Sequence, residues 1–227
     1  MTRGATTARG LDRLVNFSDA TVAIALTLLV LPLVELPGDG RDAAAVLADG
    51  GSELLGFGVS FAVVGRLWVA HHAVFEDVRA YDGTLLALGF VWLGGIVLVP
   101  FATALLTAAD DGPDALADVL YLATLVLTCL ALMGVQARLR RRPALVRPGA
   151  VVDTTGGLVA VGLLVVALVL AALVPAVGML WVLLLALSGP VGRVVRSRTA
   201  AGRAAEEGHG RDDGVPGDEA REPAGPA

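Results

Sequence analysis

Long uncharged runs of aliphatic residues alternate along this chain with short connections that hold almost all of its charge. The clearest uncharged runs cover residues 20–34, 85–108 and 159–187. An apolar helix of about 20 residues crosses the roughly 30 Å hydrocarbon core of a bilayer. The pattern therefore predicts an all-α membrane protein with six transmembrane helices, at about 16–35, 53–75, 84–107, 116–137, 151–173 and 177–195.

The fifth and sixth predicted helices are separated only by an expected break. Residues 159–187 form one uncharged run, which is too long for a single crossing. Pro175 and Gly178 lie within this run, and a proline inside a helix removes a backbone hydrogen-bond donor. We therefore expect two helices joined by a hairpin rather than one long helix.

The two ends of the chain differ from the predicted membrane domain, residues 13–197. Residues 1–12 form a short basic segment, and residues 198–227 are rich in Gly, Ala, Pro and charged residues. This tail has too few apolar residues to bury a core, so we expect it to be disordered. The basic start resembles a secretory signal, but the apolar run continues past Leu29 without a small-residue cleavage site. We expect the first helix to stay uncleaved.

Arginine supplies all of the basic side-chain charge apart from histidine, and it falls on alternate connections. The intervening connections carry mainly aspartate, with Arg41 as an exception. The positive-inside rule then places both termini in the cytoplasm. The arginines on the predicted cytoplasmic side are Arg3, Arg9, Arg13, Arg79, Arg138, Arg140, Arg141, Arg142, Arg147, Arg193, Arg196, Arg198 and Arg203.

Composition narrows the class of protein. Of the 227 residues, 56% are hydrophobic and 17% are charged, with a formal net charge of −5. These values exclude an ordinary soluble enzyme, and the negative net charge does not suit a nucleic-acid partner. The single Cys129 cannot form an internal disulfide. The sequence has no phosphate-binding loop, nucleophile elbow or pair of catalytic acids, so we expect no enzyme activity and no cofactor.

A few polar and ionisable side chains lie within the predicted helices, where lipid makes them costly. Asp19 lies about one turn inside the first helix, and the second contains Arg66, Trp68, His71 and His72. Adjacent histidines point about 100° apart on a helix, so we expect no His–His metal centre. An anchoring cluster at the helix ends, an intramembrane polar network and a proton relay all stay open.

Three motifs give the chain a resemblance to a known family. The first helix begins with R-x-x-x-F-S-D, formed by Arg13, Phe17, Ser18 and Asp19. The second helix contains W-x-x-H-H-x-x-F, starting at Trp68, and the third ends in P-F-x-T, starting at Pro100. With these motifs, residues 13–197 resemble the prokaryotic form of the transmembrane protein 175 family of potassium channels.

The resemblance implies a leak-type cation channel in the cell membrane. Its permeant ion would be K⁺, and no cofactor is implied. It implies a homotetramer in the lipid bilayer, with the first helices around a central pore. The constriction would then be Ile24, with Leu28 and Leu31 further out, and Thr27 would offer a hydroxyl to the ion. From periodicity alone, the same aliphatic stripe suits a lipid-facing or core position equally well.

The resemblance also assigns a supporting network near the cytoplasmic end of the pore helix, made of Arg13, Phe17, Ser18, Asp19, Trp68, His71 and His72. Gly89 stands where relatives often have Asn, and Ala23 where some have Ser. We therefore expect one hydrogen bond fewer and weaker K⁺ selectivity. The alternatives are a proton-coupled secondary transporter that uses Asp19 and His71 or His72, and a non-transporting membrane scaffold.

Overall fold

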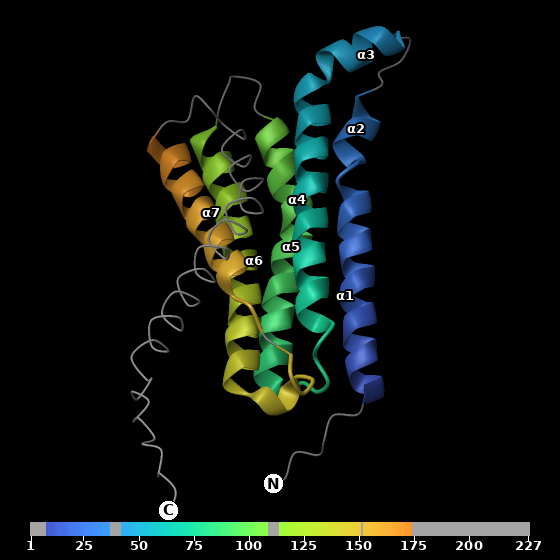
Figure 1. The fold of residues 1–227 in the computed structure, drawn as a ribbon. Helices are drawn as coiled ribbons and strands as arrows, with labels where there is room; N and C mark the ends of the chain where they lie inside the picture. Colours follow the sequence, from blue (N-terminus) through green and yellow to red (C-terminus); the bar gives the residue numbers. More distant parts are fainter. Residues whose placement is uncertain (1–7, 37–41, 109–113, 151, 174–227) are drawn as a thin grey trace, which may run out of the picture.

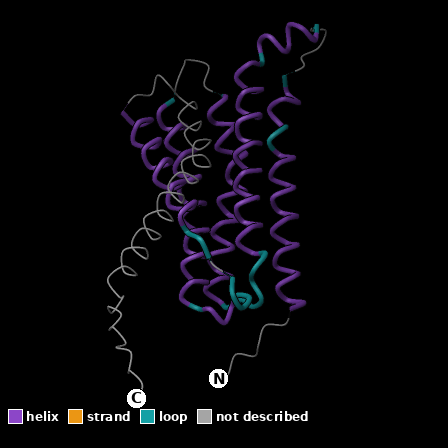
Figure 2. The backbone as a smooth tube through the Cα atoms, viewed as in Figure 1, coloured by secondary structure: helices purple, strands orange, loops and turns teal. Residues whose placement is uncertain are grey.

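A computed structural model describes residues 8–36, 42–108, 114–150 and 152–173, which form a bundle of long helices (Figure 1). Short loops and turns connect the helices (Figure 2). The elements are α1 (Ala8–Leu28), α2 (Leu31–Glu35), α3 (Ala43–Asp49), α4 (Gly51–Phe75), α5 (Gly83–Thr107), α6 (Ala115–Arg141), the 3₁₀ turn η1 (Pro143–Leu145) and α7 (Thr155–Leu173).

The first five predicted transmembrane helices are all present. Five helical segments in the described part of the chain are long and apolar enough to cross a membrane, the first of them running from Arg9 to Glu35 through α1 and α2. The predicted sixth helix at 177–195 and the tail at 198–227 lie outside the described residues. The all-helical prediction is therefore confirmed for the residues that the structure describes.

Two helices extend beyond the predicted apolar spans. α1 begins at Ala8 rather than near residue 16, and α6 continues to Arg141 rather than ending near residue 137. Hydropathy marks only the part of a helix that suits lipid, whereas arginine is also a good helix former in water. α7 starts later than expected, at Thr155, because the Asp153 carboxylate accepts a hydrogen bond from its backbone N–H at 2.8 Å.

The first predicted transmembrane helix is interrupted before its end. α1 stops at Leu28 and α2 starts at Leu31. Pro32 explains the break, because it lacks the N–H that would bond to the Leu28 carbonyl, and its ring crowds that carbonyl. The chain turns instead through a hydrogen bond from the Val30 N–H to the Thr27 carbonyl at 3.3 Å.

The core is centred on α5 and α6, with α4 and α7 packed against them. Trp92 and Ile96 of α5 and Leu125 of α6 are fully buried there. Gly95 permits the close approach of α5 to α6, since a Cβ at this position would clash with the Thr128 hydroxyl. α1 packs mainly on α4 and α5 and lies at one edge of the bundle (Figure 1).

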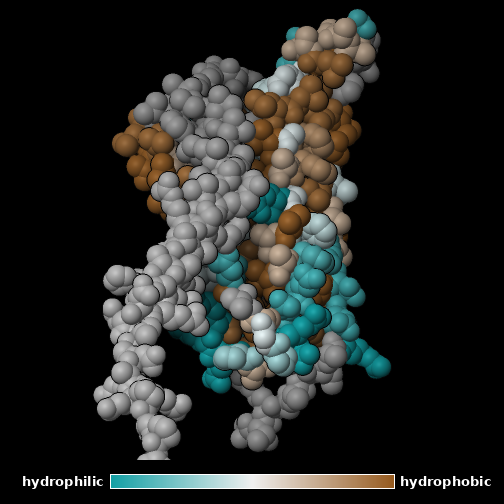
Figure 3. Space-filling view, viewed as in Figure 1, coloured by the Kyte–Doolittle hydropathy of each residue, from teal (hydrophilic) through white to brown (hydrophobic). Residues whose placement is uncertain are grey.

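The arginine-rich end of the bundle, at the bottom of Figure 1, joins the start of α1, the α4–α5 loop and the loop around η1. Hydrophilic residues gather there, below a mainly apolar surface (Figure 3). Val78 and Val146 pair in an isolated antiparallel bridge and lie in a small apolar cluster with Leu11 of α1. The bridge joins the two loops to each other, and the apolar cluster packs them against the start of α1.

A second link at this end joins α5 to α6. Asp82 caps α5 by accepting a hydrogen bond from the Leu85 N–H at 2.9 Å, and it forms an ion pair with Arg138, whose Nε lies 3.0 Å from the carboxylate. The hydrogen bonds from Arg138, with a smaller contribution from the Leu85 N–H, hold the pKa of the Asp82 carboxyl below its usual range. The carboxylate therefore stays charged at any pH near neutrality.

Candidate functional site

The exposed side of α1 and α2 carries the residues predicted to form the constriction, with Ile24 and Leu28 on α1 and Leu31 at the start of α2. Ile24 exposes 60% of its surface, Leu31 exposes 52% and Leu28 exposes 39%. The opposite face, which includes Val22 and Ala25, is buried in the core. The three predicted residues therefore face away from the rest of the subunit, where pore, lipid or a second subunit would lie.

Thr27 lies on the same exposed face. Its hydroxyl donates a hydrogen bond to the Ile24 carbonyl at 2.7 Å. The proton is thereby engaged within the helix, while the oxygen keeps a lone pair that can accept from water or contact a cation. This chemistry suits the role predicted for Thr27.

Two residues of the predicted supporting network are joined directly. The Trp68 Nε1–H donates a hydrogen bond to the Asp19 carboxylate at 2.9 Å and so connects α4 to α1. A hydrogen bond to a charged acceptor is stronger than one between neutral groups. It holds α1 against α4 in the half of the bundle nearer the arginine-rich end.

The two histidines have different surroundings. His71 is buried, and its ring stacks on Trp92 of α5 with centroids 4.0 Å apart and on Phe75 of its own helix at 4.4 Å. His72 is exposed, and its ring lies 5.5 Å from that of Trp68. Since the two rings point to different sides of α4, they do not form a common site, as their adjacent positions predicted.

The remaining network residues make separate contacts. Ser18 is buried and donates to the Leu14 carbonyl of its own helix at 3.0 Å. The Phe17 ring lies 6.2 Å from that of Phe90 on α5. Arg13 is exposed and forms no hydrogen bond or ion pair with any residue that the structure describes. The structure thus groups Asp19 and Trp68 with the histidines and leaves Arg13 apart.

Trp92 occupies the centre of this region, although the sequence did not single it out. It is fully buried, and its indole N–H has no hydrogen-bond partner among the described residues. It lies one helical turn after Gly89, the position where the sequence predicted a missing hydrogen bond. A Cβ at Gly89 would have no atom within 4 Å.

A buried hydroxyl cluster joins three helices toward the other end of the bundle. The Ser60 Oγ of α4 lies 2.8 Å from the Thr103 Oγ1 of α5 and 3.0 Å from the Tyr121 hydroxyl of α6. Only Thr103 belonged to a recognised motif. Single polar residues within apolar helices have no periodicity that would predict such a contact.

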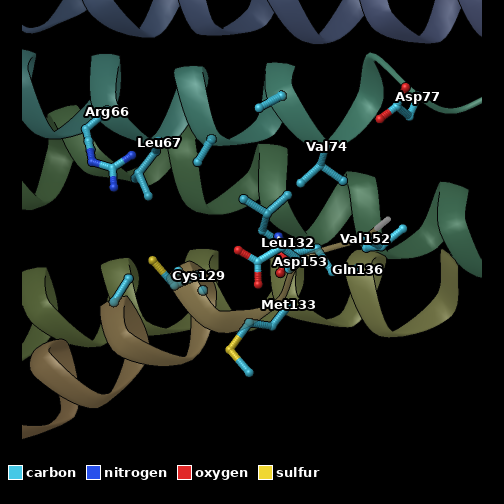
Figure 4. Close-up of a pocket in the computed structure, with 15 residues that line it drawn as sticks. Arg66, Leu67, Val74, Asp77, Cys129, Leu132, Met133, Gln136, Val152 and Asp153 are labelled. Carbon is cyan, nitrogen blue, oxygen red and sulfur yellow. Dashed lines mark hydrogen bonds between the residues drawn. The ribbon is translucent and has the colours of Figure 1, made fainter. Parts of the chain in front are cut away.

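Arg66 lies apart from the exposed face of α1. It lines a cavity of about 400 Å³ between α4, α6 and the start of α7. Figure 4 shows Arg66 toward one end of this cavity and Asp77 toward the other. The part of the chain that is described contains no cluster of histidine, cysteine and carboxylate side chains able to hold a metal ion, and Cys129 is buried.

Comparison with known proteins identifies relatives. Residues 13–100 match the family described as "Endosomal/lysosomal potassium channel TMEM175". A potassium channel of Streptomyces collinus is 32% identical over 139 residues, which cover 60% of this chain and 68% of that protein. The human endosomal/lysosomal proton channel TMEM175 is 36% identical over 99 residues, which cover 38% of this chain and only 20% of the human protein.

The fold of a solved relative agrees with these matches. The crystal structure of a lysosomal potassium-selective channel TMEM175 homolog from Chamaesiphon minutus is similar with a TM-score of 0.62 and 25% sequence identity, over 84% of this chain and 96% of that chain. These relatives are ion channels and not enzymes. Given its membrane-spanning helices and its match to two thirds of the Streptomyces protein, this chain is a multi-pass membrane protein that belongs to the TMEM175 family.

Proposed function

We propose that this protein is a potassium-permeable channel in which four subunits place α1 around a central pore. The observation that carries the proposal is the exposure of Ile24 and Leu28 on α1, whose opposite face is buried in its own subunit, together with the exposure of Leu31 at the start of α2. Family membership adds support, because the Streptomyces and Chamaesiphon relatives are named as potassium channels.

The position of α1 leaves it free to contact other subunits. α1 lies at the edge of the subunit, so copies of it can meet around the axis of a closed cyclic assembly (Figure 1). Ala20 and Ala23 are exposed on the same side of the helix as Ile24. Small side chains of this kind let helices approach closely in a membrane.

In this arrangement Ile24 forms the main constriction. A ring of isoleucine side chains excludes water and so raises the energy of a hydrated ion, which is how apolar rings gate pores. Leu28 and Leu31 form further apolar rings toward the acidic end, and Thr27 supplies a hydroxyl oxygen between the rings of Ile24 and Leu28. The channel is of the leak type, and its selectivity depends on this short polar and apolar lining.

The orientation follows from the charge of the two ends. The start of α1, the α4–α5 loop and the α6–α7 connection carry the arginines, so we place this end in the cytoplasm. The opposite end carries Asp42, Asp49 and Asp114. We place the protein in the cell membrane with its N-terminus inside.

The test is K⁺ flux into liposomes that contain the purified full-length protein. Ile24→Asn hydrates the constriction, and because each 1.4 kcal/mol removed from a barrier raises a rate about tenfold, we expect a rise of about tenfold or more. Val97→Asn on the exposed surface of α5 makes the same chemical change outside the proposed pore and should leave flux unchanged. Equal flux through Ile24→Asn and wild type would refute the constriction, and no flux from any variant would favour a scaffold.

Proton conduction is the second candidate, because the animal relatives are named as proton channels. Asp19 is the ionisable residue of α1 nearest the proposed pore, with its carboxylate held by Trp68. A pH gradient across the same liposomes, with a pH-sensitive dye inside, measures proton flux separately from K⁺ flux. A proton-coupled carrier moves protons together with K⁺, so a K⁺ gradient alone should change the dye signal, whereas a K⁺ channel should change it only after a protonophore is added.

A further inference from the structure

A shallow pocket at the arginine-rich end is unrelated to the proposed pore face. It is lined by Leu11 and Asp12 of α1, by Val78 and Arg79 of the α4–α5 loop, and by Arg147 beyond η1. The two hydrophobic residues are buried, whereas the two arginines are exposed. The pocket therefore combines an apolar floor with charged walls at the point where α1 begins.

The β-bridge explains why two arginines meet there. Val78 pairs with Val146, the Arg79 N–H donates to the Leu145 carbonyl at 2.8 Å, and the Arg147 N–H donates to the Asp77 carbonyl at 2.9 Å. In this register Arg79 and Arg147 are diagonal neighbours, which lie about 7–8 Å apart on one face of paired strands. The bridge thus holds both arginines at the rim of the pocket, next to the buried Val78.

The charges of this pocket are not balanced within the described chain. Neither guanidinium forms a hydrogen bond or ion pair with a described residue. Asp12 is the acidic residue of the lining. Asp77 is opposite Arg147 in the bridge, but its side chain lines the separate cavity beside Arg66 (Figure 4). Two cations thus face one carboxylate and are open to an anionic ligand.

We propose that this pocket binds the phosphate of an anionic phospholipid from the leaflet at the arginine-rich end. A guanidinium offers paired N–H donors that match phosphate oxygens, and a single phosphodiester can lie between two of them. Leu11 and Val78 supply the apolar floor that a lipid glycerol or acyl chain covers. The pocket lies at the end of the membrane-spanning segment that starts at Arg9, which is where headgroups lie.

The position of the ligand connects the lipid to α1. A phosphate held by Arg79 and Arg147 contacts the turn of α1 that contains Leu11 and Asp12, and the same two arginines are fixed to the bridged loops. Removal of the Asp12 charge should therefore strengthen binding, whereas removal of the arginine charges should weaken it. This site goes beyond the proposed channel function, and its occupancy is measured without any ion flux.

The test is native mass spectrometry of the full-length protein in neutral detergent, titrated with phosphatidylglycerol. Each arginine near an anionic headgroup contributes about fivefold in affinity, so Arg79→Gln with Arg147→Gln should bind phosphatidylglycerol about 30-fold more weakly. The matched control is Arg141→Gln with Arg142→Gln, which removes the same charge from exposed arginines outside the pocket and should bind like wild type. Asp12→Asn should bind more tightly, and phosphatidylcholine should bind weakly to every variant.

Three results would overturn the proposal. Equal loss of binding in the two arginine pairs would indicate diffuse surface charge rather than a site. Weaker binding by Asp12→Asn would contradict the position of the phosphate beside α1. Displacement of phosphatidylglycerol from the wild type by inorganic phosphate at equal concentration would assign the pocket to a soluble phosphate. Melting temperatures of all variants without lipid verify that each one folds.

Discussion

Gly95 and Gly94 are adjacent on α5, and the structure predicts opposite outcomes for alanine at the two positions. A Cβ at Gly95 would clash with the Thr128 hydroxyl of α6 and lie 3.1 Å from the Thr128 Cβ and 3.4 Å from its Cα. A Cβ at Gly94 would have no atom within 4 Å. Gly94→Ala is therefore the matched control for Gly95→Ala.

The expected loss of folding free energy depends on which atoms of Thr128 can move away from the new Cβ. Rotation of Thr128 would relieve the hydroxyl clash but break its 2.7 Å hydrogen bond to the Thr124 carbonyl, and the close Cα can move only with the helix. Overpacking of this kind costs about 1–3 kcal/mol of folding free energy. Both alanines gain up to about 1 kcal/mol of helix propensity over glycine. Since this gain is common to both variants, Gly95→Ala should be about 1–3 kcal/mol less stable than Gly94→Ala.

The measurement is SDS-induced unfolding of each full-length variant in mixed micelles, followed by far-UV circular dichroism. Gly94→Ala should unfold at or above the SDS fraction of the wild type, and Gly95→Ala below it. Thr128→Ala removes the clashing hydroxyl, so combining it with Gly95→Ala should recover part of the loss. Identical unfolding of the two single alanine variants would refute the close approach of α5 and α6 at this point.

Three further outcomes follow from the observed contacts. Trp68→Phe removes the hydrogen-bond donor to Asp19 and should destabilise the protein by about 1 kcal/mol. When Trp68→Phe is made in a protein that already carries Asp19→Asn, it should cost less, and a double-mutant cycle measures this difference. The depressed pKa of Asp82 means that its pair with Arg138 stabilises the fold at neutral pH and weakens only below about pH 4. Asp82→Asn should therefore melt below the wild type at pH 7, and the difference should vanish on acidification. Tyr121→Phe should cost about 0.6 kcal/mol, a typical value for a hydrogen bond between membrane helices, in the same SDS titration.

Hydropathy predicted the five apolar helices in the described part of the chain well, because lipid imposes a simple rule. Each segment that crosses must be continuously apolar and must satisfy its own backbone hydrogen bonds, so sequence alone marks where it lies. Polar helix ends obey no such rule, which is why α1 and α6 extend past their predicted limits. The break before Pro32 has a local cause, because it depends on one missing backbone N–H. The proline in the sequence is therefore a sufficient signal for this break.

Contacts between helices were harder to predict than the helices themselves. The R-x-x-x-F-S-D motif identified Asp19, and W-x-x-H-H-x-x-F identified Trp68, yet only the structure shows that these two side chains bond to each other. Trp92 carries no signal in the sequence, because one aromatic residue in a continuously apolar helix does not show which side of that helix faces the core. The Val78–Val146 bridge joins two loops far apart in sequence, and short loop segments have no pattern that encodes their partner.

The rotation of α1 illustrates what the structure adds to the channel hypothesis. Apolar residues occur all around this helix, so hydropathy alone cannot distinguish the face that packs from the face that a pore would use. Burial separates the faces and leaves Phe17 and Ile24 exposed seven residues apart on α1, with Leu31 also exposed at the start of α2. Phe17, however, has its ring against Phe90 of α5, which draws it toward its own subunit. Of the two positions nearer the arginine-rich end, Ile24 is therefore the better candidate for the narrowest ring.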